Sequence, residues 1–472
     1  MDKVADSNKT EQIRDTFAAQ KANQYVIANC TIKERKAKLK ALNNAVEFTY
    51  RDKIRAAMMA DFKKPAEDVD LNEIFIIKNE VKEALHHLGQ WTRDQAVSTP
   101  ISLLGSKSYI KYEPKGVCLI ISPWNFPFNL TFGPLVSAIA AGNTVIIKPS
   151  EMTPNSSAII KEIVEELFDP NEVAVFEGAV ETSTALLELP FNHIFFTGSP
   201  AVGKIVMKAA AKNLCSVTLE LGGKSPTIVD ETASVKSTAK RLIWGKFLNT
   251  GQICIAPDYL YVHENKREEL IAEMKNVLVK FFGENPENSD SYSRMVNTKH
   301  AERVMGYVKD AVAKGAKVIA GGQSNEKYIA PTLITDVAKD SSLMLNEIFG
   351  PVLPIFTFQN IDEVIGEINA GEKPLALYIY SNSNKNTDYI LNNTRAGTTC
   401  INNNDVQFFN GNLPFGGSNN SGIGKSHGYY GFLAFSNARG VYKQIIPGAI
   451  EMIMPPYTGF KRKLIALTLK YF

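Results

Sequence analysis

Val117-Cys118-Leu119-Ile120-Ile121 and Thr144-Val145-Ile146-Ile147 are short apolar runs rich in β-branched residues, and with the segment between them they decide the fold class. The runs predict buried strands, and residues 131–141 predict a helix that ends at Gly142. The alternation continues with a helix opened by Pro154, strands at 173–176 and 193–196, and a helix from Pro200 to Lys212. This βαβ order predicts a parallel sheet that binds its ligand at the carboxyl ends of the strands.

A second α/β stretch follows. Apolar residues recur at helical spacing in 270–278 and 301–312, and strands are expected at 351–358, 375–381 and 397–401. A chain of 472 residues is longer than one hydrophobic core usually supports, so two or three domains are expected.

The composition is that of an ordinary globular protein, with 44% apolar and 21% charged residues. The net charge of +3 is too close to zero to indicate a nucleic-acid partner. Residues 1–6 lack the apolar core of a signal peptide, and no run of about 18 apolar residues occurs. We therefore expect a cytoplasmic protein without a membrane span.

The cysteines are widely spaced and form no CxxC pair, so neither a disulfide framework nor a zinc cluster is indicated; they are Cys30, Cys118, Cys215, Cys254 and Cys400. Most cysteines in such a protein are small buried hydrophobes, and the apolar runs around Cys118, Cys215 and Cys400 fit that interpretation. Cys254 differs because Asn249-Thr250-Gly251-Gln252 precedes it and Ala256-Pro257-Asp258 follows. A thiol in such a loop is a candidate nucleophile, with the buried hydrophobe as its alternative.

Glu220 is the single acid in an apolar stretch that runs from Val217 into Leu221 and two glycines. Partial burial would raise its pKa toward that of a useful general base. The alternative is a carboxylate that accepts hydrogen bonds from the backbone at the end of a strand.

Gly198-Ser199-Pro200-Ala201-Val202-Gly203-Lys204 has the spacing of a phosphate-binding loop between a strand and a helix. Ile205 stands where a nucleotide hydrolase needs Ser or Thr for magnesium, which argues against that class. A glycine-rich helix N-terminus still suits a pyrophosphate without a metal.

Pro123-Trp124-Asn125-Phe126-Pro127 follows the first strand, and its prolines would hold the Asn125 amide in place. A preorganised amide can stabilise an oxyanion; a rigid turn with a capping Asn is the alternative. The six histidines show no metal-ligand spacing, so no metal site is expected, and none is marked as the partner that a Cys–His protease requires.

Taken together, segments in register from about residue 10 to 445 resemble the signatures of the aldehyde dehydrogenase superfamily. They are 123–127, Lys148-Pro149-Ser150-Glu151, 196–199, Glu220-Leu221-Gly222-Gly223-Lys224, 251–254, Glu347-Ile348-Phe349-Gly350-Pro351 and Pro414-Phe415-Gly416-Gly417. The modest length, residues 254–259 and the run Ser421-Gly422-Ile423-Gly424-Lys425-Ser426-His427-Gly428 resemble the class 3 branch, which includes fatty and aromatic aldehyde enzymes.

The resemblance implies a two-step covalent reaction. Cys254 would attack the aldehyde carbon to give a thiohemiacetal, while the Asn125 amide and the Cys254 backbone N–H hold the oxyanion. After hydride transfer to the nicotinamide, Glu220 would activate water to release the acid from a thioester.

The resemblance also implies a set of NAD-binding residues. Lys148 and Glu151 would bind the adenosine ribose, Glu347 the nicotinamide ribose beside Phe349, and Ser199 would face the pyrophosphate. The set is completed by Trp124, Ser150, Gly198, Gly203, Leu221 and Gly222. A glutamate near the ribose 2′-oxygen repels a 2′-phosphate and favours NAD, but enzymes of this branch often use both cofactors, so NADP is the alternative.

The implied architecture is α/β, with a Rossmann-type cofactor domain (1–93 and 115–224) and an α/β catalytic domain (225–405). A small β oligomerisation element (94–114 and 406–446) and a C-terminal tail (447–472) complete it. In the element, a hairpin at Ser102–Glu113 would pair with a strand near Val441–Ile446 of the same chain. A homodimer is expected.

Two segments depart from the family pattern or extend it. The segment between Asn404-Asp405 and Leu413-Pro414 matches the branch poorly and is expected to line the substrate entrance. The tail from Phe460 to Lys470 is basic and amphipathic; we expect it to pack on a partner subunit, with contact to a membrane surface as the alternative.

The expected activity is NAD(P)-dependent oxidation of medium-to-long aliphatic or aromatic aldehydes. An acylating relative would keep the cysteine but pass the thioester to coenzyme A or phosphate, and Glu220 argues against it. A binding module that only keeps the fold is a second alternative, against which Cys254, Glu220 and Asn125 together argue.

Overall fold

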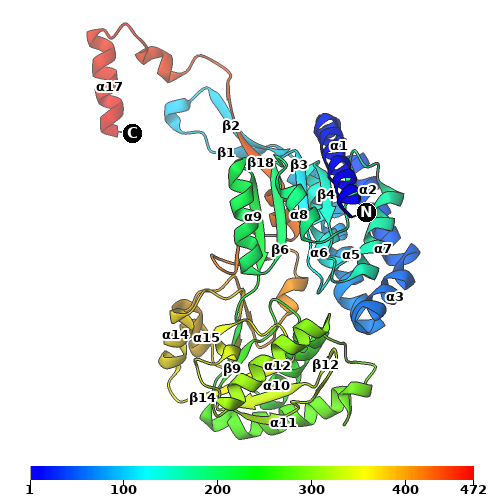
Figure 1. Ribbon diagram of the computed structural model, residues 1–472. Coiled ribbons are helices and arrows are strands. Elements are labelled where there is room, and N and C mark those ends of the chain that lie inside the picture. The colour runs from blue at the N-terminus through cyan, green and yellow to red at the C-terminus, as the bar shows by residue number, and fades with distance from the viewer. Residues whose placement is uncertain (1, 472) are drawn as a thin grey trace.

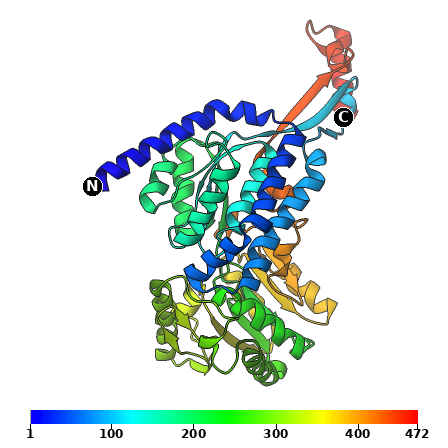
Figure 2. The same cartoon turned by 90° about the vertical axis from the view of Figure 1, so that its right-hand side faces the viewer.

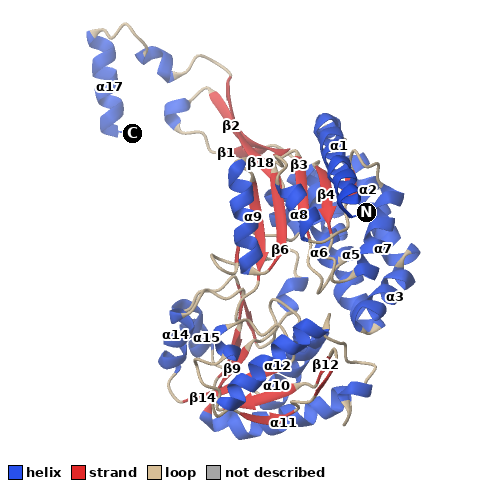
Figure 3. Ribbon diagram, viewed as in Figure 1, coloured by secondary structure: helices blue, strands red, loops and turns tan. Residues whose placement is uncertain are grey.

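The apolar run Val117–Ile121 forms β3, an inner strand of the first of two large sheets (Figure 1, Figure 3). The computed structural model of the chain describes residues 2–471. Strands β3 to β7 are parallel, as the βαβ order predicts, and β17 adds to the edge beside β7 in the antiparallel direction. The order is β17 (Gly422–Ile423), β7 (Ser216–Leu221), β6 (His193–Gly198), β3, β4 (Thr144–Lys148) and β5 (Val173–Val175).

Helices cover both faces of this sheet because successive residues of its buried strands point to opposite sides. Cys118 and Ile120 face one core, with α2 (Ile32–Asn44), α3 (Arg51–Phe62), α5 (Phe75–Trp91), α6 (Asn129–Ala141) and α7 (Pro154–Leu167). Leu119 and Ile121 face the other, with α1 (Asp2–Ala28), α8 (Val180–Leu187) and α9 (Pro200–Lys212). Short α4 (Ala66–Val69) and the π-helical turns η1 (Ala45–Thr49) and η2 (Asp70–Ile74) link the N-terminal helices.

Local turn chemistry places the ends of these helices where the sequence predicts them. Gly142 ends α6 in a left-handed conformation with φ 92°, which glycine adopts without strain. Ser199 caps α9, because its side chain accepts a hydrogen bond from the Val202 amide and Pro200 occupies the first turn.

The second sheet forms the other half of the molecule, and all its strands except β10 run parallel. Its order is β10 (Lys317–Ala320), β13 (Thr332–Thr335), β14 (Val352–Phe358), β9 (Tyr259–His263), β8 (Pro226–Val229), β15 (Ala376–Tyr380) and β16 (Thr398–Ile401). Buried clusters pack it against α10 (Val235–Phe247) and α11 (Glu264–Phe282), and against α12 (Thr298–Ala313), α14 (Ile361–Ala370) and α15 (Asn384–Asn393). The short elements α13 (Ser342–Leu345), β11 (Ser324–Asn325), β12 (Tyr328–Ile329) and η5 (Pro286–Asn288) lie in its loops.

A third sheet projects from the body as an arm, with the order β1 (Gln95–Val97), β2 (Ser106–Pro114) and β18 (Ser436–Gln444) (Figure 1). The predicted hairpin at Ser102–Glu113 is wrong. Residues 101–103 form a 3-10 turn, η3 (Ile101–Leu103), and β2 is one continuous strand whose antiparallel partners are β1 and β18. The chain changes direction before β2, at Gly105 with φ 95°, so the strand pairs outside the segment.

The segment 406–446, predicted to belong to one oligomerisation element, contributes to several parts of the fold. Only β18 joins the arm, whereas β17 joins the first sheet and α16 (Gly428–Ala434) packs against α6 and α5. The 3-10 turn η6 (Val406–Phe409) contacts the second sheet at β16.

Both ends of the described chain extend from the body. Figure 2 shows α1 running along the first half with its N-terminal end projecting. The tail consists of η7 (Ala449–Ile453) and the helix α17 (Gly459–Tyr471), and α17 has no buried residue. Among residues 2–471, no helix combines the length and apolar character that a membrane crossing requires.

Candidate active site

The carboxyl ends of β6 and β7 meet loops of the second half of the molecule around a cavity of about 270 Å³. Most of the residues singled out in the sequence line it. They are Trp124, Asn125, Gly198, Ser199, Glu220, Leu221, Gly222, Cys254, Glu347 and Phe349, together with Pro123, Leu130, Thr197, His300 and Arg303. The ligand position predicted from the βαβ order is therefore a real cavity at that edge of the sheet.

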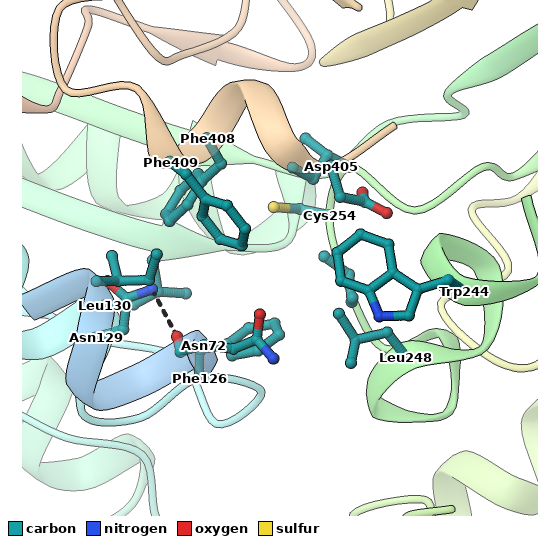
Figure 4. A pocket seen from close by; sticks show the side chains of 13 residues that line it. Asn72, Phe126, Asn129, Leu130, Trp244, Leu248, Cys254, Asp405, Phe408 and Phe409 are labelled. Atoms are coloured by element: carbon teal, nitrogen blue, oxygen red, sulfur yellow. Dashed lines mark hydrogen bonds between the residues drawn. The ribbon is translucent and has the colours of Figure 1, made fainter. Parts of the chain in front are cut away.

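Cys254 follows a tight 3-10 turn, η4 (Leu248–Gly251), in which Asn249 and Thr250 adopt left-handed backbone angles. Gly251 has φ 70°, and a Cβ atom there would lie 2.4 Å from the Gly350 carbonyl oxygen. The turn thus needs glycine, and Cys254 after it is half-buried. Figure 4 shows the sulfur pointing toward Phe408 and Phe409, into a second pocket with apolar walls that is described below.

The surroundings of Cys254 disfavour the thiolate. Burial raises the pKa of the thiol, and the carboxyl groups of Glu347, Glu220 and Asp405 raise it further. A base within the site is therefore needed before the sulfur can attack.

Asn125 lies in the turn between β3 and α6 and is buried. Its side-chain amide donates to the Gln252 carbonyl oxygen at 3.0 Å, and that bond orients it beside the Cys254 loop. An amide nitrogen carries two hydrogens, and no described residue accepts the second, so one remains for a substrate oxygen. The preorganised amide predicted from the sequence is therefore present.

A buried ion pair that sequence reasoning missed supports this turn. The Lys64 ammonium donates to the Asn125 carbonyl oxygen at 3.2 Å and lies 3.5 Å from the Glu73 carboxylate, and both side chains are 0% exposed. The carboxylate also accepts the Asn129 backbone N–H at 2.7 Å. Burial raises the pKa of Glu73 to about 7, and the Lys64 charge acts against this rise.

Glu220 is the penultimate residue of β7 and pairs with Thr197 of β6 and Gly422 of β17. The side chain is 6% exposed, and its Oε1 accepts a hydrogen bond from the Ser426 hydroxyl at 2.9 Å. Burial raises the pKa of the carboxyl to about 7, although Ser426, His427 and Lys425 lower it. The predicted desolvation of this acid is confirmed.

Three buried oxygens that line the cavity have no hydrogen-bond partner among residues 2–471: Thr197 Oγ1, Glu220 Oε2 and Glu347 Oε1. Buried polar atoms are nearly always paired, so this wall is built for a polar ligand. Gly222 keeps the space open, because a Cβ there would lie 2.0 Å from Glu347 Oε2. Burial and the nearby Asp258 raise the pKa of Glu347 to about 8.

The other residues expected to hold a dinucleotide, Lys148, Ser150, Glu151 and Gly203, do not line this cavity and lie along the first sheet at β4 and α9. Lys148 ends β4, beside Ile121 of β3, and its ammonium lies 2.6 Å from the Glu151 carboxylate. Ser150 follows, and its side chain accepts the Met152 backbone N–H. Gly203 lies in the first turns of α9, where a Cβ would lie 2.7 Å from the Leu221 side chain. The helix N-terminus, the glycines and the unpaired oxygens fit a pyrophosphate and ribose hydroxyls.

On the other side of Cys254 lies an apolar pocket with aromatic walls (Figure 4). It is lined by Asn72, Ile76, Phe126, Asn129, Leu130, Trp244, Leu248, Ile253, Ile255, Asp405, Phe408 and Phe409. Asp405, Phe408 and Phe409 line this pocket. That the segment between Asn404-Asp405 and Leu413-Pro414 lines the substrate entrance stays a prediction. Within the described part of the chain, no group of three or more His, Cys, Asp and Glu residues could hold a metal ion.

Comparisons with known proteins identify relatives across nearly the whole chain. A model of the aldehyde dehydrogenase family matches residues 1–441. The 4,4'-diaponeurosporen-aldehyde dehydrogenase of Staphylococcus aureus is 44% identical, covering 90% of this chain and 92% of that protein. Aldehyde dehydrogenase family 3 member B3 of Mus musculus is 39% identical, covering 97% and 94%. A solved structure of Staphylococcus aureus AldH in a substrate-bound state superposes with a TM-score of 0.92 and 42% identity, over 97% and 99% of the two chains.

The Lys64–Glu73 pair yields a stability prediction. Lys64→Met leaves the Glu73 carboxylate buried without its counter-charge, so we expect about 3–5 kcal/mol less stability in urea unfolding at pH 8. Adding Glu73→Gln should recover most of the loss. The matched control is Lys53→Met, which removes a pair with Glu162 in which the side chains are 56% and 46% exposed, so it should cost at most about 1 kcal/mol. Equal losses in Lys64→Met and Lys53→Met would contradict a structural role for the buried pair.

Proposed function

The chain belongs to the aldehyde dehydrogenase family, and from this premise we propose that it oxidises medium- and long-chain aliphatic or aromatic aldehydes to carboxylic acids through a cysteine-bound thioester. The observation that carries the proposal is the position of Cys254. Its side chain lies between the apolar pocket and the cavity with unpaired polar oxygens, so one sulfur atom faces both reactants.

The substrate class follows from the apolar pocket. Its walls are mainly aromatic and aliphatic, with Phe126, Trp244 and Phe408 around the approach to the sulfur. Such walls favour an alkyl chain or an aromatic ring, because each buried methylene contributes about 0.8 kcal/mol. The name of the relative that acts as a 4,4'-diaponeurosporen-aldehyde dehydrogenase agrees with an extended apolar substrate.

The first step is addition of sulfur to the carbonyl carbon. Glu220 removes the thiol proton, the sulfur–carbon bond forms, and the carbonyl electron pair moves to oxygen. The free hydrogen of the Asn125 amide and the backbone N–H of Cys254 stabilise that oxygen, an interaction that is typically worth about 2.7–4 kcal/mol per donor.

The cavity of about 270 Å³ would hold part of the dinucleotide. Glu347 and the N-terminus of α9 would bind the ribose and pyrophosphate, with Trp124 and Phe349, whose ring centroids lie 5.3 Å apart, at the nicotinamide end. When bound, NAD(P) supplies the hydride acceptor that leaves a thioester on Cys254. Glu151 beside Lys148 disfavours a 2′-phosphate, so we propose NAD as the preferred cofactor and NADP as the weaker one.

Release of the product requires water. Glu220 is placed to deprotonate it, because Oε2 is unpaired while the Ser426 hydroxyl holds Oε1. Hydroxide then attacks the thioester and the carbon–sulfur bond breaks. The sulfur takes back the proton that Glu220 removed from water, so the acid leaves and Cys254 is again a thiol. A buried carboxyl with a pKa of about 7 is well matched to this role at neutral pH.

The alternative is an acylating enzyme that transfers the thioester to coenzyme A. It needs no water-activating base, so the burial and hydrogen bonding of Glu220 favour hydrolysis. Turnover with coenzyme A present decides between them: free acid supports the hydrolytic enzyme, and acyl-CoA supports the acylating one.

We also propose a cytoplasmic homodimer. All five cysteines are free thiols, in agreement with a reducing compartment. The arm exposes Ile101, Leu104, Ile445 and Ile446, and the tail exposes Phe460 and Leu469, which favours burial against a second copy. Contact of the basic tail with a membrane surface is the less favoured alternative.

The mechanism predicts two distinct defects. Cys254→Ala should abolish NADH formation while leaving cofactor binding intact, with Cys215→Ala as the matched control that keeps full activity. Glu220→Gln should form its first equivalent of NADH more slowly than the wild type, because the thiol also loses its base, and should then fall by about 10²–10⁴-fold in steady state. Stopped-flow absorbance separates the burst from turnover; a wild-type steady-state rate in Glu220→Gln would contradict the base assignment.

The raised pKa of Glu220 predicts a pH dependence. The base must be unprotonated, so the rate of thioester hydrolysis should rise with pH up to about 7 and level off above it. A pH jump applied after the NADH burst measures this step alone. An inflection near the ordinary pKa of a glutamate, about 4.3, would contradict the claim that desolvation raises the pKa of this base.

The apolar pocket predicts a chain-length series. With saturated aldehydes of increasing length, kcat/KM should rise by up to about fourfold per methylene until the pocket is filled. Trp244→Ala should flatten the rise for long substrates and spare short ones. Parallel series with NAD and NADP test the cofactor preference, and a flat profile in the wild-type enzyme would contradict the proposed substrate class.

A further inference from the structure

Cys254 also borders a smaller cavity of about 40 Å³. Its wall includes Glu220, Cys254, Ser426, His427 and Glu80. A water molecule needs about 10–15 Å³ of such space, so the cavity can hold a short row of waters. It connects the proposed base to a histidine that the reaction described above does not use.

His427 is buried, and its Nδ1 lies 2.6 Å from Oε1 of Glu80 on α5. The other oxygen of Glu80 accepts the Gly428 backbone N–H at 3.1 Å. A carboxylate accepts hydrogen bonds, so Nδ1 carries the hydrogen and Nε2 is left with a lone pair. No described residue forms a hydrogen bond with Nε2, and the ring lines the cavity.

The backbone shows that this histidine is held in place at a cost. His427 has φ 71°, a region that residues other than glycine rarely adopt, and such strain costs on the order of 1–3 kcal/mol. The ring is clamped edge-on by Phe408 and Phe415, with centroids 4.4 and 5.2 Å away. The protein thus fixes one imidazole between the cavity and Glu80.

The proposed reaction needs a group that takes a proton from Glu220. In each turnover Glu220 receives first the Cys254 thiol proton and then a proton from the attacking water, and only the second returns to the sulfur when the acid leaves. Glu220 is 6% exposed, and its cavity toward the first sheet is the one assigned to the dinucleotide. A proton left on Glu220 would block the next hydrolysis.

We propose that His427, held by Glu80, takes the proton from Glu220 in each turnover, an inference that rests on the proposed function. A proton passes from the Glu220 carboxyl to cavity water and then to Nε2, and the Glu80 carboxylate balances the charge of the imidazolium that forms. The same proton leaves Nε2 through water once the product acid has left the site, so Nδ1 keeps its hydrogen and the imidazole returns to its starting state. His427 is a positioning and relay residue that acts through Glu220.

The other titratable groups around this ring are few. Glu220 on β7 and Cys254 share its cavity, Glu80 faces it from α5, and Lys425 precedes it by two residues in its own segment. The Lys425 ammonium donates to the Gly416 and Gly417 carbonyl oxygens and is already engaged. A purely structural alternative is that His427 only supports the aromatic walls at Phe408 and Phe415.

Two variants of the full-length enzyme separate these roles. His427→Gly removes the imidazole at a backbone angle that glycine tolerates, and Glu80→Gln keeps a similar shape but cannot balance the charge of an imidazolium. Both should form the first equivalent of NADH at the wild-type rate and then turn over about 10²-fold more slowly. His86→Asn, at an exposed position on the same helix, is the control and should behave as wild type.

Rescue by imidazole tests the proton role directly. Added imidazole should restore the steady-state rate of His427→Gly in proportion to the concentration of unprotonated imidazole. It should not restore the rate of Glu220→Gln. Absence of rescue in a folded His427→Gly enzyme, or wild-type turnover in Glu80→Gln, would overturn the inference. Wild-type protein that oxidises no aldehyde would instead refute the proposed function, so the two failures are distinguishable.

Discussion

Desolvation of the Glu220 carboxyl is the constraint on which the site depends. Its position near the end of β7, between β6 and β17, removes it from water and raises its pKa to about 7. The same burial would be a net cost to the fold if nothing offset it, and the Ser426 hydroxyl satisfies only one of its oxygens. The other oxygen is left for a proton from the thiol or from water, so the cost in stability and the chemical capacity have one physical origin.

The two halves of the molecule contribute the groups that surround Glu220. The first sheet contributes the base and the cavity for a dinucleotide, and the loop after α10 brings Cys254 against it. Asn125 joins them, because its amide bonds to the Cys254 loop while Lys64 and Asn249 hold its carbonyl oxygen. Buried hydrogen bonds therefore hold the loops that carry the proposed nucleophile and oxyanion donor, which is the preorganisation that the proposed mechanism requires.

Features that depend on neighbouring residues were predictable from the sequence. Gly142 and Ser199 mark helix ends through their own conformational preferences. The apolar stretch around Glu220 predicts that its carboxyl is buried. Features that depend on distant residues were not. Lys64, Glu73 and Asn125 meet only in the folded chain, Ser426 reaches Glu220 across 206 positions, and β2 takes its partners from β1 and β18 instead of folding back on itself. No periodicity or motif encodes those contacts locally.

The most direct test of a covalent path through Cys254 is mass spectrometry of the peptide that carries it, after Glu220→Gln enzyme has been mixed with NAD and an aldehyde and quenched in acid. The account predicts that this peptide gains the mass of the acyl group in proportion to the NADH formed. NADH formation with an unmodified Cys254 peptide would contradict it.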